Sequence, residues 1–183
     1  MEAMSVSVNL SLFDVIADGA SAESTLWEES LLPRHERQLE PVFSSLVQDP
    51  GLALGVETIY EGYLVHYGTS RLFATSDADT ALLLGDYLYA HGLVRVAQTG
   101  NVAAVEDLAE LISLCAQGRA DGRDGDGAAW AATAALLGGE ALAPARAALR
   151  DAGDGFGLEI AARAAAGDEA VELALDRHLR LVA

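Results

Sequence analysis

From Leu26 onward, apolar residues recur along the chain at the three- and four-residue spacing of a helix face. The clearest case is residues 52–67, where leucine, valine, isoleucine and tyrosine form such a stripe and Gly68 follows as a C-terminal cap. Ser76, with acidic residues directly after it, predicts the start of a second helix that runs to about residue 99, because negative charge stabilises a helix N-terminus.

The second half of the chain continues this helical pattern. Asn101 predicts the N-cap of a helix whose apolar stripe includes Leu108, Leu111 and Cys115. The stretch 120–127 is rich in Asp and Gly and is expected to be a loop. Further helices are expected near residues 128–137, 143–166 and 169–182.

Prolines punctuate the part of the chain that precedes residue 52. Pro33 suits the first turn of a helix that would carry Val42 and Phe43, although Pro41 must kink or split that helix. The triplet 49–51, Asp-Pro-Gly, is expected to end it.

These patterns predict an all-α protein, because no stretch after residue 25 alternates as a strand would. We expect a single helical domain over residues 26–183. Residues 1–25 alternate only weakly and then become small and polar. They are interpreted as a flexible or partner-docking N-terminal arm, which could add to a partner or dock as a short helix.

The charge balance narrows the function. The chain has 28 acidic residues against 11 basic ones, all of them Arg, and its formal net charge is -17. Such a charge repels nucleic acid and anionic membranes, so neither is an expected partner. The single Cys115 excludes an internal disulfide, and the absence of a signal-like start and of an apolar run of about 20 residues predicts a soluble, cytoplasmic protein with no transmembrane segment.

Two groups of acids invite a metal site, and neither completes one. The loop with Asp121, Asp124 and Asp126 departs from the calcium-binding EF-hand pattern, because Ala128 stands where a third ligand belongs. It is interpreted as a solvated turn.

Glu57 and Glu61 lie one helical turn apart, and Asp86 could face them from the next helix. The Glu-x-x-His pairs of di-iron bundles are missing, so these acids are expected to be partly solvated or paired with Arg. No metal and no cofactor is predicted.

Residues 80–101 read TALLLGDYLYAHGLVRVAQTGN. They resemble the trans-polyprenyl diphosphate synthase family, whose members carry a comparable Ala-Leu-Leu-x-Gly-Asp-Tyr-Leu helix. Upstream, residues 53–71 are similar to the family helix that ends in Leu-Ile-His-Asp-Asp. His66 falls on the His of that motif, and Tyr67 and Gly68 occupy the places of the first two aspartates.

Residues 154–168, DGFGLEIAARAAAGD, resemble the second family signature, Gly-x-Ala-Phe-Gln-Ile-x-Asp-Asp-x-x-Asp followed by Gly-Asp. Glu159 falls on the Gln of that signature. The places of its three aspartates hold Ala162, Arg163 and Ala166. The matches follow the family's order and cover about residues 50–168.

The resemblance implies a helical bundle with a reduced isoprenoid-synthase fold. In the family the two aspartate clusters hold Mg²⁺, which binds the allylic diphosphate and stabilises it as it leaves. Mg²⁺ needs oxygen ligands, and these are missing at both places. The resemblance therefore implies a truncated, degenerate member without the metal-binding aspartates, so the chain is expected not to be an enzyme.

A remnant of the family's pocket would be marked by residues near the two altered motifs. Arg71 is what is left of the family's Arg pair. Arg163 could pair with Glu57 or Glu159, although an exposed Arg on the helix surface is the more ordinary expectation. The candidate pocket residues are Glu57, Tyr60, Tyr63, His66, Tyr67, Arg71, Glu159 and Arg163.

Family members generally pair through the helices around the GDYL segment, which is well retained in this chain. Gly85 and Gly92 are seven residues apart and so share a helix face, which allows another helix to approach closely. That helix could belong to a second chain or to the same one. The candidate contact face consists of Gly85, Asp86, Tyr89 and Gly92.

Three functional hypotheses follow. The leading one is a non-catalytic protein that acts by association, as a homodimer or as the small partner of a complete prenyl diphosphate synthase. The alternative is a binding protein with an apolar cavity for an isoprenoid or another lipid, lined by the tyrosines of residues 60–67. An enzyme of changed chemistry, using Glu57, Glu61, His66 and Asp86, ranks last, because no nucleophile, base and orienting group can be assembled from their spacing.

Overall fold

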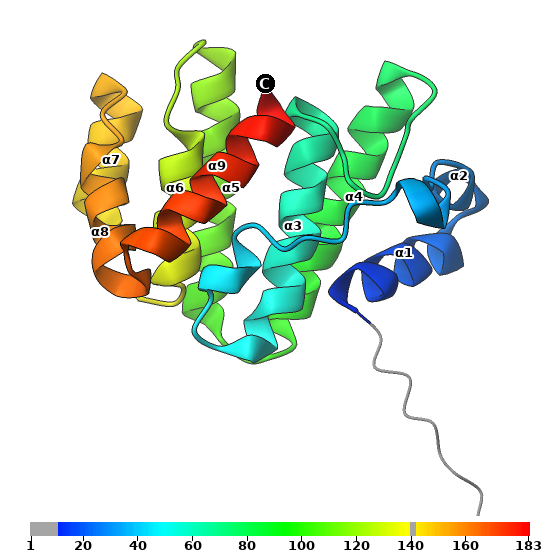
Figure 1. The fold of residues 1–183 in the computed structure, drawn as a ribbon, viewed down its shortest axis with the longest axis horizontal. Helices are drawn as coiled ribbons and strands as arrows, with labels where there is room; N and C mark the ends of the chain where they lie inside the picture. The colour runs from blue at the N-terminus through cyan, green and yellow to red at the C-terminus, as the bar shows by residue number, and fades with distance from the viewer. Residues whose placement is uncertain (1–10, 140–141) are drawn as a thin grey trace, which may run out of the picture.

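The computed structural model describes residues 11–139 and 142–183, and within them the chain is all-α, as predicted (Figure 1). One isolated antiparallel bridge joins Leu31 to Phe73. Two short 3-10 turns, Arg34–Glu36 and Ser44–Leu46, precede the main bundle. The helices are α1 Leu12–Glu23, α2 Thr25–Glu29, α3 Pro50–Tyr67, α4 Ala78–Ala97, α5 Val102–Ala120, α6 Asp126–Ala135, α7 Ala143–Ala152, α8 Phe156–Ala166 and α9 Asp168–Val182.

The helices form a bundle in which α3 and α4 make the most extensive packing (Figure 1). The pairs α6 with α8 and α5 with α6 extend the bundle towards α7 at one edge, and α1 and α2 lie at the opposite edge. Helix α9 crosses the bundle obliquely and packs on both α6 and α8. The helices that carry the two altered aspartate motifs, α3 and α8, therefore lie on different sides of α6.

Helix α1, which covers about half of the expected N-terminal arm, is part of the packed domain. Ser11 and Asp14 form a capping box at its start, a sequence pattern that fixes a helix N-terminus. Its apolar face, including Phe13 and Ile16, is buried in a small core with Leu84 and Leu88 of α4. The arm was expected over residues 1–25, of which residues 1–10 lie outside the described part of the chain.

The prediction of a helix after Pro33 is wrong. Residues 37–43 run as irregular backbone between the two 3-10 turns, and both Val42 and Phe43 are buried against the bundle. Pro41 forbids a continuous helix through this segment, and burial of these two side chains fixes the backbone instead.

The triplet 49–51 starts a helix and does not end one, which corrects the expected stop. The Asp49 carboxylate accepts a 2.9 Å hydrogen bond from the Gly51 N–H, and Pro50 takes the first turn of α3. The Asp-Pro pair marks a helix boundary, as expected, but the helix follows the pair and does not precede it.

The three helices predicted from the strongest caps are confirmed with ends close to those expected. Gly68 follows α3, Asp77 caps α4 through the Thr80 N–H, and Asn101 caps α5. The helix expected over 143–166 is instead two helices, because Gly153 adopts a left-handed conformation with φ of 70°. Among the described residues, no helix combines the length and apolar character needed to cross a bilayer.

Candidate functional site

Helix α3 meets α4 through glycines on both helices. Gly55 and Gly62 on α3 lie against Gly92 and Gly85 on α4, so two pairs with the same seven-residue spacing oppose each other. A Cβ at Gly92 would lie 2.4 Å from Ile59 Cγ1 and 3.0 Å from the Gly55 carbonyl oxygen. The backbones are therefore too close for any side chain at these positions.

The candidate contact face on α4 is divided by this crossing. Gly85 and Gly92 point at α3 of the same chain, where a Cβ on Gly85 would meet the His66 ring at 2.4 Å. Tyr89 is half-buried and packs with its ring 5.1 Å from that of His66. Only Asp86 of the four faces solvent, with a side chain that is 66% exposed.

Asp86 lies beside His66 at the edge of the α3–α4 crossing, with its Oδ1 3.3 Å from His66 Nε2. Burial lowers the pKa of His66 below its usual value, and the Asp86 carboxylate partly opposes that shift. Asp86 is thus a surface partner of His66 and lies apart from the Glu57 and Glu61 carboxylates.

The opposite side of α3 holds a buried ion cluster, defined here as Arg71, Glu57 and Glu61. Arg71 Nη1 lies 2.6 Å from Glu57 Oε1, and Nη2 lies 2.9 Å from Glu61 Oε2. All three side chains are almost completely shielded from solvent. The rings of Phe13 and Tyr60 flank the guanidinium at 5.0 and 5.1 Å.

Glu61 also holds the loop that carries Arg71. Its Oε1 accepts hydrogen bonds from the backbone N–H groups of Arg71 and Leu72, at 2.8 and 3.0 Å. Glu57 accepts a hydrogen bond from the Ser44 hydroxyl, and Arg71 Nη1 donates to the Glu40 carbonyl oxygen at 2.9 Å. The ion cluster therefore ties the irregular segment before α3 and the loop after it to the helix itself.

The ion cluster carries two carboxylates for one guanidinium. Burial opposes the charge on Arg71, but the nearby Glu61 and Glu57 outweigh that effect and raise its pKa. Removing one carboxylate would still leave the guanidinium a partner, whereas removing Arg71 would leave two buried charges with none.

A second polar network extends from the same side of α3 to α5, α6 and α9. The Asp126 carboxylate accepts a hydrogen bond from the Tyr63 hydroxyl, and its Oδ2 lies 2.5 Å from Arg119 Nη2. His178 Nε2 lies 3.5 Å from Asp126 Oδ1, and a 3.0 Å hydrogen bond joins His178 Nδ1 to the Tyr60 hydroxyl. These contacts connect four helices through one carboxylate.

The surroundings shift the pKa values of this network strongly. Burial raises the pKa of Asp126, but the nearby His178 side chain, the hydrogen bond from Tyr63 and the charge of Arg119 outweigh it, so the pKa falls well below its usual range. Burial raises the pKa values of Tyr60 and Tyr63, and nearby carboxylates add to the rise. Both phenols are therefore neutral hydrogen-bonding groups.

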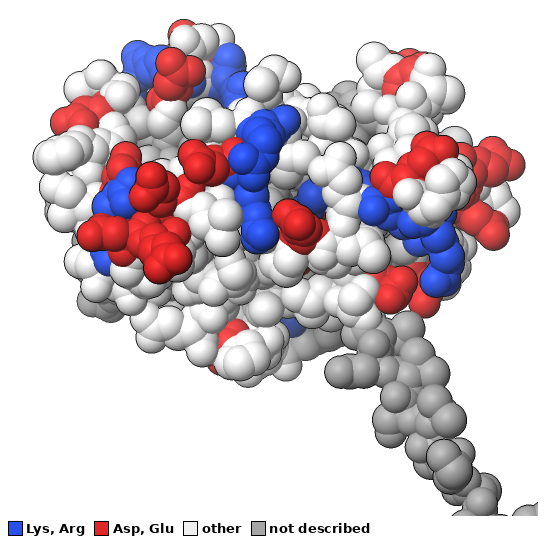
Figure 2. Space-filling view, in the orientation of Figure 1, with Lys and Arg blue, Asp and Glu red and all other residues white. Residues whose placement is uncertain are grey.

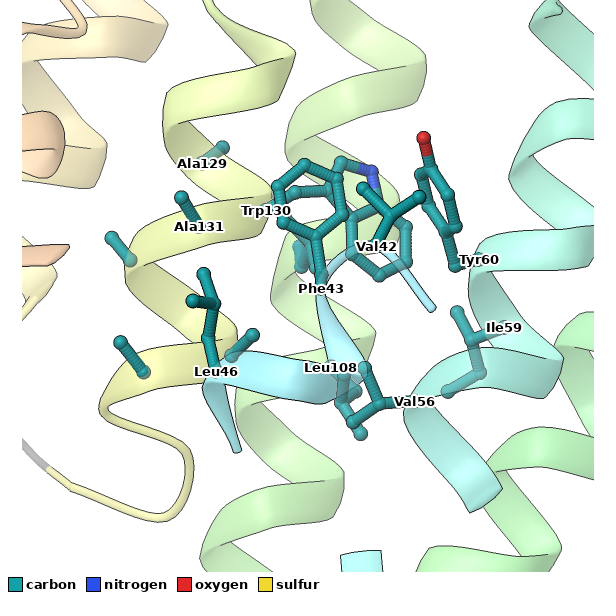
Figure 3. Close-up of a cluster of buried hydrophobic side chains, with 14 of the residues drawn as sticks. Val42, Phe43, Leu46, Val56, Ile59, Tyr60, Leu108, Ala129, Trp130 and Ala131 are labelled. Atoms are coloured by element: carbon teal, nitrogen blue, oxygen red, sulfur yellow. The ribbon is translucent and has the colours of Figure 1, made fainter. Parts of the chain in front are cut away.

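The tyrosine rings fill the interior of the bundle and do not line an open cavity. Tyr60 and Tyr63 are completely buried, and Tyr60 meets Phe43 and Trp130 edge-on with ring centres 5.0 Å apart in each case (Figure 3). Phe43 also stacks on Trp130 at 5.7 Å. Tyr67, at the end of α3, is half-buried with its ring 5.3 Å from that of Tyr63.

The two candidates on α8 lie away from this interior. Arg163 Nη2 lies 2.8 Å from Glu159 Oε1, one turn earlier on the same helix, so Arg163 pairs with one of the two acids named for it, and its side chain is partly exposed. Ala162 is completely buried. The structure therefore joins Glu57, Tyr60 and Arg71 in one place, links Tyr63 to them through Tyr60, and leaves Glu159 and Arg163 elsewhere.

Several residues of these networks were missed by sequence reasoning. Asp126 was interpreted as part of a solvated turn, and His178 belongs to no motif, because their partners are distant in the chain. Arg119 and Trp130 carried no motif. Within residues 11–139 and 142–183, no group of three or more His, Cys, Asp or Glu side chains is arranged to hold a metal ion.

Comparison of the chain with protein-family models, with curated proteins and with solved structures finds no match to any of them.

Proposed function

We propose that this protein is a non-catalytic helical protein that acts by association, as a homodimer or as the small partner of a prenyl diphosphate synthase. The observation that carries the proposal is the outer face of α4, defined as Leu82, Leu83, Asp86, Ala90 and Val94. Leu82, Leu83 and Val94 are 55%, 56% and 53% exposed, so three large apolar side chains of this helix are open to solvent.

The other sides of α4 are already occupied within the chain. Helix α3 covers its glycine side, α5 packs beside it, and Leu84 and Leu88 join the core beneath α1. In a chain with a net charge of -17, the outer face carries the single acid Asp86. A weakly charged apolar face of this kind suits protein association, since burial of apolar surface drives it and little charge must be desolvated.

The residues at the altered motifs do not fit the Mg²⁺ ions that the family resemblance implies. Tyr67 and Gly68 offer no carboxylate, and at the second motif Ala162 is buried while Arg163 brings a positive charge. The carboxylates nearest to the first motif, Glu57 and Glu61, bind Arg71. These contacts support a protein that does not ionise a diphosphate.

The lipid-binding alternative finds less support. It depends on Tyr60, Tyr63 and Tyr67 lining a cavity, and the first two are packed against Trp130 and His178 inside the core.

Sedimentation over a wide concentration range tests the association. We expect the wild-type chain to form a dimer, and the double variant Leu83→Arg with Val94→Arg to remain monomeric. The matched control, Phe156→Arg with Ile160→Arg, changes two exposed apolar residues on α8 and should still dimerise. A monomeric wild type would overturn the homodimer. Dimer loss in the control alone would overturn the role of α4.

A prenyl-transfer assay with Mg²⁺, an allylic diphosphate and isopentenyl diphosphate tests the non-catalytic part. The isolated protein should form no elongated product. Mixed with a complete prenyl diphosphate synthase from the same organism, it should change that enzyme's rate or product length if it is the small partner, and the α4 double variant should not. Chain elongation by the isolated protein would contradict the proposal.

A further inference from the structure

Arginines gather around a cleft between the segment that precedes α3 and the C-terminal half of α9. The cleft has a volume of about 300 Å³, and its polar lining consists of Gln38, Glu40, Thr69, Arg71, Arg177 and Arg180. In Figure 2, basic side chains form a strip at the position of α9, with acidic side chains on either side. Of these residues only Arg71 was a candidate pocket residue, and the proposed function does not account for the cleft.

The charge around the cleft runs against that of the whole chain. Three of the 11 arginines line it, together with one acid, Glu40, although the net charge of the protein is -17. Glu57 and Glu61 lie behind Arg71, are completely shielded from solvent and neutralise its charge, so Arg71 adds no net positive charge to the cleft. The two cations that face the opening are thus Arg177 and Arg180.

The structure holds these groups in defined positions before any ligand binds. Arg71 is fixed by the ion cluster at the floor of the cleft. Arg177 Nη1 donates a 2.8 Å hydrogen bond to the Pro41 carbonyl oxygen, and its Nη2 lies 3.4 Å from Glu40 Oε2. The Thr69 N–H donates to the Leu181 carbonyl oxygen at 2.7 Å, which joins the opposite rim to the end of α9.

Arg180 is the cation most available to a ligand. It lies three residues after Arg177, so the two side chains leave α9 on the same side. Among the described residues it makes no ion pair within 4.0 Å. Val42 and Leu181, both buried, add an apolar wall beside these charges.

We propose that this cleft binds a small phosphate-bearing anion. Guanidinium groups present paired N–H donors that match phosphate oxygens, and Arg177 and Arg180 would hold such a group from one side. Gln38 and Thr69 add neutral donors at the rim. The volume suits a ligand at the small end of the usual range, and the apolar wall suits the organic part of a phosphate ester. Glu40 competes with the anion for Arg177.

Calorimetric titration with inorganic phosphate and with phenyl phosphate, at constant ionic strength set with sodium chloride, tests the proposal. Saturable binding of either ligand by the wild type supports it. Tighter binding of phenyl phosphate assigns an organic ester, and equal binding assigns free phosphate. No binding of either, or equal binding of succinate, would overturn a phosphate site.

Two variants that are expected to change the affinity in opposite directions test whether the anion binds in the cleft. Arg180→Gln should weaken it about tenfold, because a charge-assisted hydrogen bond is lost. Glu40→Gln should strengthen it about two- to fivefold, because Arg177 is released. Arg34→Gln and Glu36→Gln change the same charges at exposed positions outside the cleft and should leave the dissociation constant unchanged. Equal effects of Arg180→Gln and Arg34→Gln would show that only net charge matters and would overturn the site.

Discussion

The two sides of α3 are buried by opposite means. Towards α4, the helix presents Gly55 and Gly62, and contact is made between backbones with almost no side chain between them. On its other side it presents Glu57 and Glu61, and contact depends on one guanidinium that enters from the loop after the helix. Both sides are fully buried, yet one is specified by the absence of side chains and the other by charge.

This difference separates the kinds of change that each side tolerates. The glycine side has no room, so an added methyl group must push two helices apart. The charged side is filled by long polar side chains whose energy depends on keeping every partner. The glycine side should therefore be sensitive to added volume, and the charged side to loss of charge. The following substitutions test each sensitivity separately.

The largest effect is expected from Arg71→Met, which keeps much of the side-chain volume and removes the charge. Glu57 and Glu61 would be left buried without a cation, which costs about 3–5 kcal/mol of unfolding free energy. Urea unfolding followed by circular dichroism measures the change, with Arg34→Met, at an exposed position, as the control. A loss as small as that of the control would show that the ion cluster contributes nothing to folding.

The next effect is expected from Asp126→Asn and depends on pH. Because the folded-state pKa of Asp126 lies below its unfolded value, its ionised form stabilises the protein above about pH 4, and that contribution is lost as the pH falls further. At pH 7 the variant should lose about 1.5–3 kcal/mol of unfolding free energy relative to the wild type, and this difference should become smaller in acid.

Unfolding in urea at pH 7, 5 and 3 provides the comparison for Asp126. Asp121→Asn removes an acid from the loop directly before α6, where a side-chain oxygen of Asp121 lies 3.8 Å from Arg123 at a more exposed position, and serves as the matched control. A gap between Asp126→Asn and the wild type that stays constant from pH 7 to pH 3 would contradict the assigned role of this carboxylate.

On the glycine side, Gly92→Ala should destabilise the protein by about 1–3 kcal/mol, since its Cβ would overlap Ile59. A Cβ at Gly118, on α5, would approach only the Arg123 carbonyl oxygen, at 3.8 Å, so Gly118→Ala should stabilise by up to about 1 kcal/mol. Thermal unfolding shows whether each variant is less or more stable than the wild type. Stabilisation by both would mean that α3 and α4 can separate without cost.

The smallest effect is expected from Asp86→Ala at the exposed edge of the crossing. Loss of a surface partner for His66 should cost less than about 1 kcal/mol. The pKa of His66, which burial already lowers, should fall further because the opposing carboxylate is gone. An NMR titration of the imidazole measures this shift, and an unchanged or higher His66 pKa would rule out the contact.

Local signals predicted the elements whose ends are set by their own residues. Helices α3 and α5 were recognised because Gly68 and Asn101 make hydrogen bonds to backbone groups of the adjoining helical turn. Helix α4 was recognised from Ser76 and the acids after it, one residue before its actual cap, Asp77. The segment 37–43 was not, because its path follows from burial of Val42 and Phe43 against distant helices. The break at Gly153 was missed because alanine-rich sequence on both sides favours helix.

For the candidate site, sequence spacing placed Glu57 and Glu61 on one face and Gly85 and Gly92 on another, since helical geometry alone decides which residues share a face. What each face meets was decided only by the tertiary structure. The glycines meet α3 of the same chain, and the acids meet Arg71. Asp126 and His178 come together across more than 50 residues of chain, and no local rule relates residues so far apart. The sequence by itself thus determined the helices and the character of their faces, whereas the partners of buried charges depended on packing, because a buried charge is stable only where a distant residue completes it.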